Sequence, residues 1–256
     1  PYLISDHNNK IVYTAGSVVM KSLNRGVGMK HISPEITNTE RGSATALAES
    51  PKDANIVYVG TDDGALWVTR DGGTNWIDCF KVGVPSADAG ETVSGKPVAV
   101  KDGEKPAGAT DKKPAGAPIA AIVPGPRWVS ELVASKHDAK RAYVTLDGHR
   151  SDDDAPYALM TNDAGDTWHS LTGSLPKGAG STRTIAEEPV NEDVLYLGTE
   201  FSAYVSINRG KHWTRLNGNM PTVAVHAFAI NVPSGEVVAG THGRSLWITN
   251  VNAVRQ

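Results

Sequence analysis

The sequence predicts an all-β protein, a β-propeller made of four-stranded antiparallel blades. A turn motif recurs four times along the chain, and an apolar motif precedes each copy. Short alternating runs of β-branched and aromatic residues, such as ATALAES, IVYVGT and ALWVTR, lie between the turns. Such alternation is typical of half-buried strands, and repetition at a spacing of roughly 40–45 residues is typical of propeller blades.

The turn motif, here called the turn box, has the pattern Ser/Thr-x-Asp/Asn-x-Gly-x-x-aromatic or large apolar. It begins at residues 22, 69, 161 and 206 as SLNRGVGM, TRDGGTNW, TNDAGDTW and SINRGKHW, and the first copy is degraded because it ends in Met29. The Asp or Asn can accept backbone N–H bonds, the glycine can adopt a positive φ, and the tryptophan can pack between blades. We therefore predict a structural role for the residues of the three complete boxes, which are Thr69, Asp71, Gly73, Trp76, Thr161, Asp163, Gly165, Trp168, Ser206, Asn208, Gly210 and Trp213.

The apolar motif sets the register of the blades. IVYTAG, IVYVGT, RAYVTL, VLYLGT and EVVAGT align Tyr13, Tyr58, Tyr143, Tyr196 and Val238. The last of these repeats has no recognisable fourth strand. We predict about five blades, over residues 1–40, 41–80, 126–173, 174–219 and 220–250, followed by a C-terminal tail over 251–256.

Residues 81–125 do not fit the repeat. They are rich in Pro, Gly, Ala, Lys and Asp, and they lack alternating apolar positions. Such a composition is typical of a long surface loop or a disordered arm. We therefore predict that this segment is an inserted loop between the second and third blades.

The two chain ends bear on how the ring would close. A propeller ring normally closes by pairing strands from the two ends of the chain, and neither end here supplies a spare strand. We therefore expect these blades to be a sector of a larger ring, seven-bladed or more. The remaining blades would come from a missing segment or from another chain.

Composition and motifs exclude several classes of function. The formal net charge is −3 at pH 7, so no basic face for nucleic acid is expected. No apolar run approaches the roughly 18 residues that span a bilayer. Cys79 is the only cysteine, which excludes an intrachain disulfide, and we expect it to be a small buried hydrophobe. The G-x-S-x-G motif, the phosphate-binding loop and the dinucleotide glycine fingerprint are absent.

The turn box resembles the Asp-box, or BNR repeat, of sialidases, sortilin-type receptors, xyloglucan-degrading glycoside hydrolases and photosystem assembly propellers. Longer strings, among them WVSELVASKHD, LYLGTEFSAYVSINRGKHW and MPTVAVHAFAINVPSGEVVAGTHGRSLWITN, resemble the C-terminal blades of large bacterial sortilin-like proteins, often labelled BNR-repeat glycosyl hydrolases. The resemblance covers nearly the whole chain apart from residues 81–125. It implies a β-propeller and an extracytoplasmic location, periplasmic or secreted, and it implies no particular reaction.

The loop positions indicate where a ligand would bind. In an antiparallel blade, the loops between strands 2 and 3 lie on the same face as the connections from strand 4 to the next blade. The 81–125 insertion and the long loop at 147–156 both belong to this face. Loops on a rigid scaffold commonly carry binding residues. The predicted ligand-binding residues are Asp62, Asp63, His149, Arg150, Asp152, Asp154, Glu200, Phe201, His242 and Arg244.

We favour a non-catalytic binding or scaffold propeller that captures a peptide, a glycan or a protein partner at this face. The alternative is a glycoside hydrolase, which needs two carboxylates about 5–5.5 Å or about 6.5–9.5 Å apart. A sialidase is disfavoured because its arginine-proline motif and its arginine triad with a tyrosine nucleophile are not recognisable. The candidate catalytic carboxylates are Glu200, Asp152, Asp153 and Asp62.

A metal site is the third interpretation of the same loops. His149, Asp152, Asp154 and His242 could hold calcium through carboxylates, or zinc through a histidine pair and a carboxylate. Their spacing matches no strong metal motif. We therefore predict no cofactor and assign no metal ligand, and calcium is the ion that the acidic loops would suit.

Overall fold

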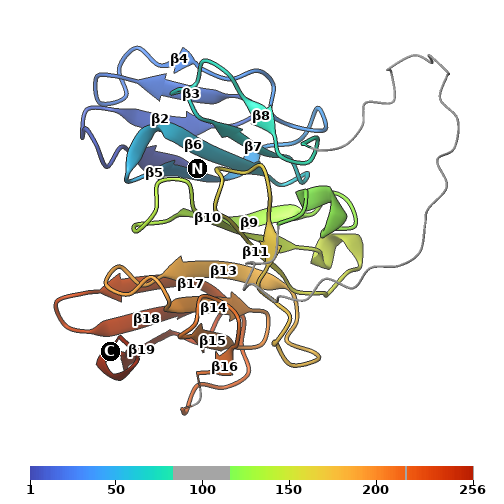
Figure 1. The fold of residues 1–256 in the computed structure, drawn as a ribbon, viewed down its shortest axis with the longest axis vertical. Coiled ribbons are helices and arrows are strands. Elements are labelled where there is room, and N and C mark those ends of the chain that lie inside the picture. The colour runs from blue at the N-terminus through green and yellow to red at the C-terminus, as the bar shows by residue number, and fades with distance from the viewer. Residues whose placement is uncertain (83–115, 217, 256) are drawn as a thin grey trace, which may run out of the picture.

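The computed structural model describes residues 1–82, 116–216 and 218–255, which form five antiparallel sheets (Figure 1). The first sheet contains β1 (Tyr2–Ile4), β2 (Val12–Ala15), β3 (Val19–Ser22) and β4 (Lys30–His31). The second contains β5 (Ala44–Ser50), β6 (Asp53–Thr61), β7 (Leu66–Thr69) and β8 (Ile77–Asp78). The third contains β9 (Trp128–Ala134), β10 (Ala142–Asp147), β11 (Tyr157–Thr161) and β12 (His169–Ser170).

The last two sheets differ in strand number. The fourth contains β13 (Thr182–Glu187), β14 (Leu195–Thr199), β15 (Ala203–Ser206) and β16 (Thr214–Arg215). The fifth has three strands, β17 (Val225–Asn231), β18 (Glu236–Thr241) and β19 (Leu246–Asn250). The helices in the described ranges are short 3-10 turns, η1 (Ile119–Ala121), η2 (His149–Ser151) and η3 (Asn252–Val254), and none could cross a membrane.

Consecutive sheets pack against one another in chain order, as the blue-to-red succession in Figure 1 shows. The first strand of each sheet packs against the sheet before it: β5 against β1 and β2, β9 against β5 and β6, β13 against β9 and β10, and β17 against β13 and β14. The first strands therefore lie next to one another, which is where a propeller has its axis. The predicted all-β propeller fold is confirmed.

The second strand of each of the first four blades carries the aligned tyrosine. Tyr58 pairs with Ala48 on one side and Val68 on the other, and Tyr143 pairs with Val133 and Met160 in the same register. These central strands are covered on both faces, so β6, β10 and β14 read as nearly continuous apolar runs.

In the turn boxes, the side chains hold the turn through local hydrogen bonds. The Gly73 N–H donates to Thr69 Oγ1 (2.9 Å), and the Asn75 N–H donates to Asp71 Oδ1 (2.8 Å). The Asn75 backbone bond is the main reason why the pKa of Asp71 is lowered to about 2. Asp163 and Asn208 accept the equivalent bonds from the N–H groups of Thr167 and His212.

Each turn box also contains two successive residues with positive φ. The pairs are Arg25 and Gly26, Gly72 and Gly73, Ala164 and Gly165, and Arg209 and Gly210. The left-handed region costs a non-glycine residue roughly 1–2 kcal/mol. The local hydrogen bonds offset this cost, which explains why arginine or alanine can precede the glycine.

The last ten residues of the predicted 81–125 loop are part of the packed structure, which corrects the expectation of a surface loop or disordered arm for them. Ala117 pairs with Trp168, and Ile119 and Val123 are buried in the core between the second and third sheets. The short run IAAIV, residues 119–123, supplies this apolar contact. It could not be recognised from the composition of residues 81–125, which is polar as a whole. Residues 83–115 lie outside the described residues.

A tyrosine–carboxylate contact joins the third sheet to the fourth. The Tyr143 hydroxyl donates to Glu187 Oε1 (2.9 Å), and the Lys136 N–H donates to Glu187 Oε2 (2.7 Å). Ser135 Oγ also donates to this buried carboxylate (2.8 Å). Tyr13 makes the equivalent contact to Glu49 (3.1 Å) between the first and second sheets.

The junction between the second and third sheets lacks this contact. Ala134 stands at the position that Glu187 occupies in the next sheet. The Tyr58 hydroxyl is buried there without a hydrogen-bond partner among the described residues. An apolar cluster fills the junction instead, and it includes Tyr58, Val68, Cys79, Ile119, Leu132, Ala134 and Trp168.

Candidate binding site

Two sets of loops pair with each other along one face of the propeller. The Asp62 N–H donates to the Ser43 carbonyl, the Glu200 N–H to the Ser181 carbonyl, and the His242 N–H to the Ala224 carbonyl. In each case the donor lies in the loop between strands 2 and 3 of a blade. The acceptor lies just before the first strand of the same blade. This pairing fixes the loop backbones, so the side chains that they carry are held in defined positions.

Arg183 on β13 is at the centre of the charged group on this face. Its guanidinium forms an ion pair with Asp147, at the end of β10, and a second with Glu200, whose Oε2 lies 3.4 Å from Nη2. Ser181 Oγ donates to the same Glu200 oxygen (3.1 Å). Arg183 therefore ties the 2–3 loop of its own blade to the strand end of the preceding one.

His149 and Asp154 approach Glu200 from the neighbouring blade. His149 Nδ1 lies 3.3 Å from Asp154 Oδ1, and one ligand-capable atom from each of the three residues lies within 4.8 Å of the other two. A histidine and two carboxylates could hold a divalent cation. Glu200 is already shared with Arg183, whose positive charge would compete with a cation.

Two histidines of the fifth blade extend the group. The rings of His226 and His242 have centroids 5.5 Å apart. Burial lowers the pKa of His226, and the positive charges of Arg183 and His242 act in the same direction. The group, here called the three-blade cluster, consists of Asp147, His149, Asp154, Arg183, Glu200, His226 and His242.

Other predicted residues hold the loops themselves. Asp62 Oδ1 accepts from the Ser43 N–H (2.7 Å), and Asp63 Oδ2 accepts from the Thr39 N–H (2.7 Å). Both carboxylates therefore accept hydrogen bonds from the segment that connects the first blade to the second, and no contact links them to Glu200.

The long 2–3 loop of the third blade is braced from several sides. Asp153 accepts from Arg127 (2.9 Å) and from the Tyr157 hydroxyl (2.8 Å), and hydrogen bonds from the Ala155 N–H and from these side chains lower the pKa of Asp153 against the effect of burial. The Arg150 guanidinium lies 3.9 Å from the centroid of the Trp128 ring. Asp152 adopts a left-handed conformation with φ 56° where η2 ends.

The remaining predicted residues are exposed. Phe201 lies beside Glu200, and its carbonyl accepts from the Val223 N–H (3.2 Å). The Arg244 carbonyl accepts from the Trp247 indole (2.8 Å), and its guanidinium forms no ion pair with any of the described residues. No contact links Arg244 to Glu200.

Sequence reasoning missed Arg183, Asp147 and His226. Arg183 lies outside the loops between strands 2 and 3, Asp147 begins the 147–156 loop and was not selected within it, and His226 shows no paired spacing with another candidate ligand. All three lie in first or second strands or at their ends. A signal was present for His226, which interrupts the apolar residues of VHAFAIN, whereas Arg183 lies in the mostly polar strand TRTIAE and gave no such signal.

Glu131 on β9 is a further residue that the sequence reasoning did not include. It lines a pocket of about 260 Å³ together with Lys136, Thr184 and Phe228, along neighbouring first strands. Burial raises the pKa of Glu131 to about 7, and hydrogen bonds from the Leu132 N–H and from Thr184 oppose the increase only partly.

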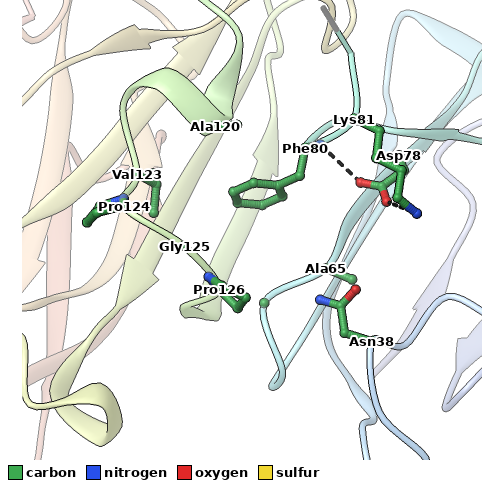
Figure 2. A pocket seen from close by; sticks show the side chains of 11 residues that line it. Asn38, Ala65, Asp78, Phe80, Lys81, Ala120, Val123, Pro124, Gly125 and Pro126 are labelled. Atoms are coloured by element: carbon green, nitrogen blue, oxygen red, sulfur yellow. Dashed lines mark hydrogen bonds and ion pairs between the residues drawn. The ribbon is translucent and has the colours of Figure 1, made fainter. Parts of the chain in front are cut away.

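A pocket of about 320 Å³ opens between the second and third blades (Figure 2). Phe80 projects into it, facing Val123 and Ala120, and Lys81 pairs with Asp78 at its rim (3.1 Å). None of the predicted site residues lines this pocket. The residues that converge near Glu200 are therefore separate from the pocket at the second junction.

Three solved structures have similar folds. The chain is similar to an ancestral GH74 enzyme (TM-score 0.64, 15% identity, 94% of this chain and 27% of that chain). It is similar to the GH74 xyloglucanase from Xanthomonas campestris (TM-score 0.61, 14% identity, 97% of this chain and 36% of that chain). It is also similar to YCF48 bound to D1 peptide (TM-score 0.55, 11% identity, 95% of this chain and 62% of that chain).

These neighbours are β-propeller proteins, and at such low identity the similarity concerns the fold. The chain spans between 27% and 62% of the length of these structures. No family model and no curated protein sequence matches the chain.

Proposed function

We propose that the protein is a non-catalytic binding propeller that captures a peptide segment of a protein partner at the three-blade cluster. The observation that carries this proposal is the convergence of charged side chains from three successive blades around Arg183. Exposed His149, Asp154 and Phe201 surround the central ion pairs. A surface with both charge signs and an exposed aromatic ring is suited to a peptide, which offers amide, charged and apolar groups together.

The hydrogen bonding of the candidate carboxylates supports binding over hydrolysis. Asp62 accepts from a loop N–H, Asp153 accepts from Arg127, and Glu200 is held by Arg183 and Ser181. These carboxylates fix loop geometry, which is the role that a rigid binding face needs. YCF48, a propeller of similar fold, binds a peptide in its solved structure.

We also propose an extracytoplasmic location and further propeller blades outside this chain, on the basis of the sequence resemblance. The same resemblance supports identifying the turn boxes as Asp-box repeats. These proposals do not depend on the identity of the ligand.

A peptide array and a glycan array, both probed with the purified chain, test the proposal. We expect binding to a subset of peptides, and His149→Ala with Phe201→Ala should weaken the best peptide at least about tenfold by calorimetry. His31→Ala is the matched control, because it removes an exposed histidine from β4. Binding to glycans alone, or peptide binding that survives in the double variant, would contradict the proposal.

A glycoside hydrolase is the second candidate, and one observation favours it. Glu131 has a pKa near 7, which is where a general acid must lie to donate a proton at neutral pH. Incubation with xyloglucan and aryl glycosides tests this function. Turnover that is abolished in Glu131→Gln and in Glu200→Gln would establish it, whereas absence of turnover with every substrate would eliminate it.

A further inference from the structure

The pocket between the second and third blades, here called the junction pocket, lies on the face that carries the three-blade cluster. Gly64 and Ala65 line it from the loop between strands 2 and 3 of the second blade. Phe80, Lys81 and the segment 123–126 line it from the connection that joins the two blades. These two kinds of loop share one face of an antiparallel blade. The junction pocket is therefore placed to take part in the same binding event as the cluster.

The lining of the junction pocket is mostly apolar. Phe80 projects into it and faces Val123 and Ala120, and Pro124 and Pro126 line it as well (Figure 2). The Phe80 ring is only partly buried. A phenyl ring of this kind gains more from contact with a second aromatic ring than from an aliphatic group of the same area.

The polar side chains that line the pocket are already paired. Lys81 Nζ lies 3.1 Å from Asp78 Oδ2, so these two charges balance each other. The other Asp78 oxygen accepts from the Phe80 N–H (3.0 Å), and Asn38 Nδ2 donates to the Asp63 carbonyl (3.1 Å). A charged ligand group would have to compete with the Asp78–Lys81 pair. The lining therefore favours an uncharged ring.

The size and rigidity of the pocket limit what it can hold. Its volume of about 320 Å³ is at the lower end of the range for ligand sites, which suits one ring system and not an extended ligand. A Cβ at Gly64 would lie 2.5 Å from the backbone nitrogen of Arg127, so the two walls are in close contact there. The Val123 N–H donates to the Ile119 carbonyl (3.0 Å) and fixes the other wall. A preformed pocket of this size suits a single anchoring side chain of a larger ligand.

Arg127 connects the junction pocket to the loop that carries His149 and Asp154. It directly follows Pro126 in the pocket wall, and its guanidinium pairs with Asp153 (2.9 Å). The pocket and the long loop of the third blade are therefore held against each other. A peptide that lies across this loop would meet an apolar subsite on one side and the charged cluster on the other.

We propose that the junction pocket binds an aromatic side chain of the captured peptide, while the three-blade cluster binds its polar groups. This inference rests on the proposed function and adds a requirement to it, namely that the peptide contains a phenylalanine, a tyrosine or a tryptophan. An aromatic anchor in a concave site is the kind of contact that dominates the binding energy of many interfaces.

An NMR titration of the whole chain with N-acetyl-tryptophanamide and N-acetyl-leucinamide tests the pocket by itself. We expect the tryptophan amide to shift the backbone signals of Ala65 and Gly125 and to bind about tenfold more tightly than the leucine amide. Ala120→Trp should abolish these shifts, because the new indole fills the pocket. Ala121→Trp is the matched control, since Ala121 is the exposed neighbour in η1 and is not among the lining residues. It should leave the shifts unchanged.

Competition extends the test to the peptide and uses the unaltered chain. The tryptophan amide should displace the best peptide from the array, and replacing the aromatic residue of that peptide by alanine should weaken binding at least about tenfold. Equal binding of the two amides, or peptide binding that is unchanged in Ala120→Trp, would overturn this inference and leave the proposed function intact. Selective binding of the tryptophan amide by a chain that binds no peptide would support the aromatic pocket and overturn the proposed function.

Discussion

Two blade–blade junctions share a backbone arrangement but differ in the side chains that meet there. One lies between the third and fourth blades, and the other lies between the second and third. At the former, Glu187 accepts from Tyr143, Ser135 and Lys136. At the latter, Ala134 and Pro51 stand at the positions of Glu187 and Lys136, so the carboxylate and the N–H donor are both absent. The donor and the acceptor have changed together, which avoids leaving either a buried carboxylate or a buried N–H unpaired.

The apolar junction compensates through packing. Trp168 and Ile119 fill the space beside Val68, and the segment that carries Ile119 comes from the insertion. The comparison teaches that the blade repeat specifies where neighbours meet, whereas the side chains decide whether hydrogen bonds or apolar burial hold them together.

The largest expected effect is at the apolar junction. Trp168→Ala should lower the free energy of unfolding by about 4 kcal/mol, because it removes a fully buried indole from a junction that has no tyrosine–carboxylate contact. Urea titration followed by circular dichroism measures the change. Trp247→Ala, on the last blade, should cost less because Trp247 is only partly buried. Equal losses for the two variants would contradict the interpretation of this junction.

The polar junction should respond to loss of its carboxylate. Glu187→Ala places an alanine between the third and fourth blades, as Ala134 already stands between the second and third. It should lower the free energy of unfolding by about 3 kcal/mol, because the buried donors of Tyr143 and Lys136 lose their acceptor. Glu187→Gln keeps an acceptor oxygen and should cost less. Glu40→Ala removes an exposed carboxylate and serves as the control. A loss below about 1 kcal/mol would show that the contact is dispensable.

The pH dependence of stability should also differ between the junctions. Glu131 stands in the third blade where the second blade has Ala46. Its folded-state pKa is near 7 and its ordinary value is 4.5, so the folded chain binds more protons between these pH values and stability falls as pH rises.

Glu131→Gln should remove this fall and be more stable than the parent at pH 8, on the order of 2 kcal/mol. Urea titrations at pH 4.5, 6 and 8 measure the difference. Parallel pH profiles for the two chains would exclude a raised pKa at this position.

The smallest effect concerns the two tyrosine hydroxyls. Tyr143→Phe should cost about 1 kcal/mol, since it removes a buried hydrogen bond to Glu187. Tyr58→Phe should cost nothing or stabilise the fold slightly, because its hydroxyl is buried without a partner in the part of the chain that the structure describes. Thermal denaturation of both variants decides the matter, and an equal loss would mean that Tyr58 has a partner in solution.

The fold could be predicted because its signals are local. Gly73 and Asp71 shape a turn within eight residues, and the aligned tyrosines set strand register within one hairpin. The junction chemistry could not be predicted in the same way, since the partner of Tyr143 lies in the next blade at Glu187. The composition of residues 81–125 was also judged as a whole, and it is polar. The two buried apolar residues Ile119 and Val123 were therefore not recognised.

The candidate site was predicted in part for a similar reason. Loop position singled out His149, Asp154 and Glu200, which lie together in the structure, and their role in binding stays a prediction. Arg183 was missed because it lies in a strand, and only loop residues were expected at this face. Its side chain nevertheless reaches Asp147 and Glu200 there. The Asp62 and Asp63 carboxylates accept hydrogen bonds from the Ser43 and Thr39 N–H groups, and their role in ligand binding stays a prediction.

The stems of the insertion are held by different blades. The Cys79 N–H donates to the Leu66 carbonyl (2.8 Å), and Ala117 exchanges hydrogen bonds with Trp168 (3.0 and 2.8 Å). Each stem is therefore fixed by backbone hydrogen bonds to its own blade, so the two attachment points are positioned independently of each other by the sheets that carry them.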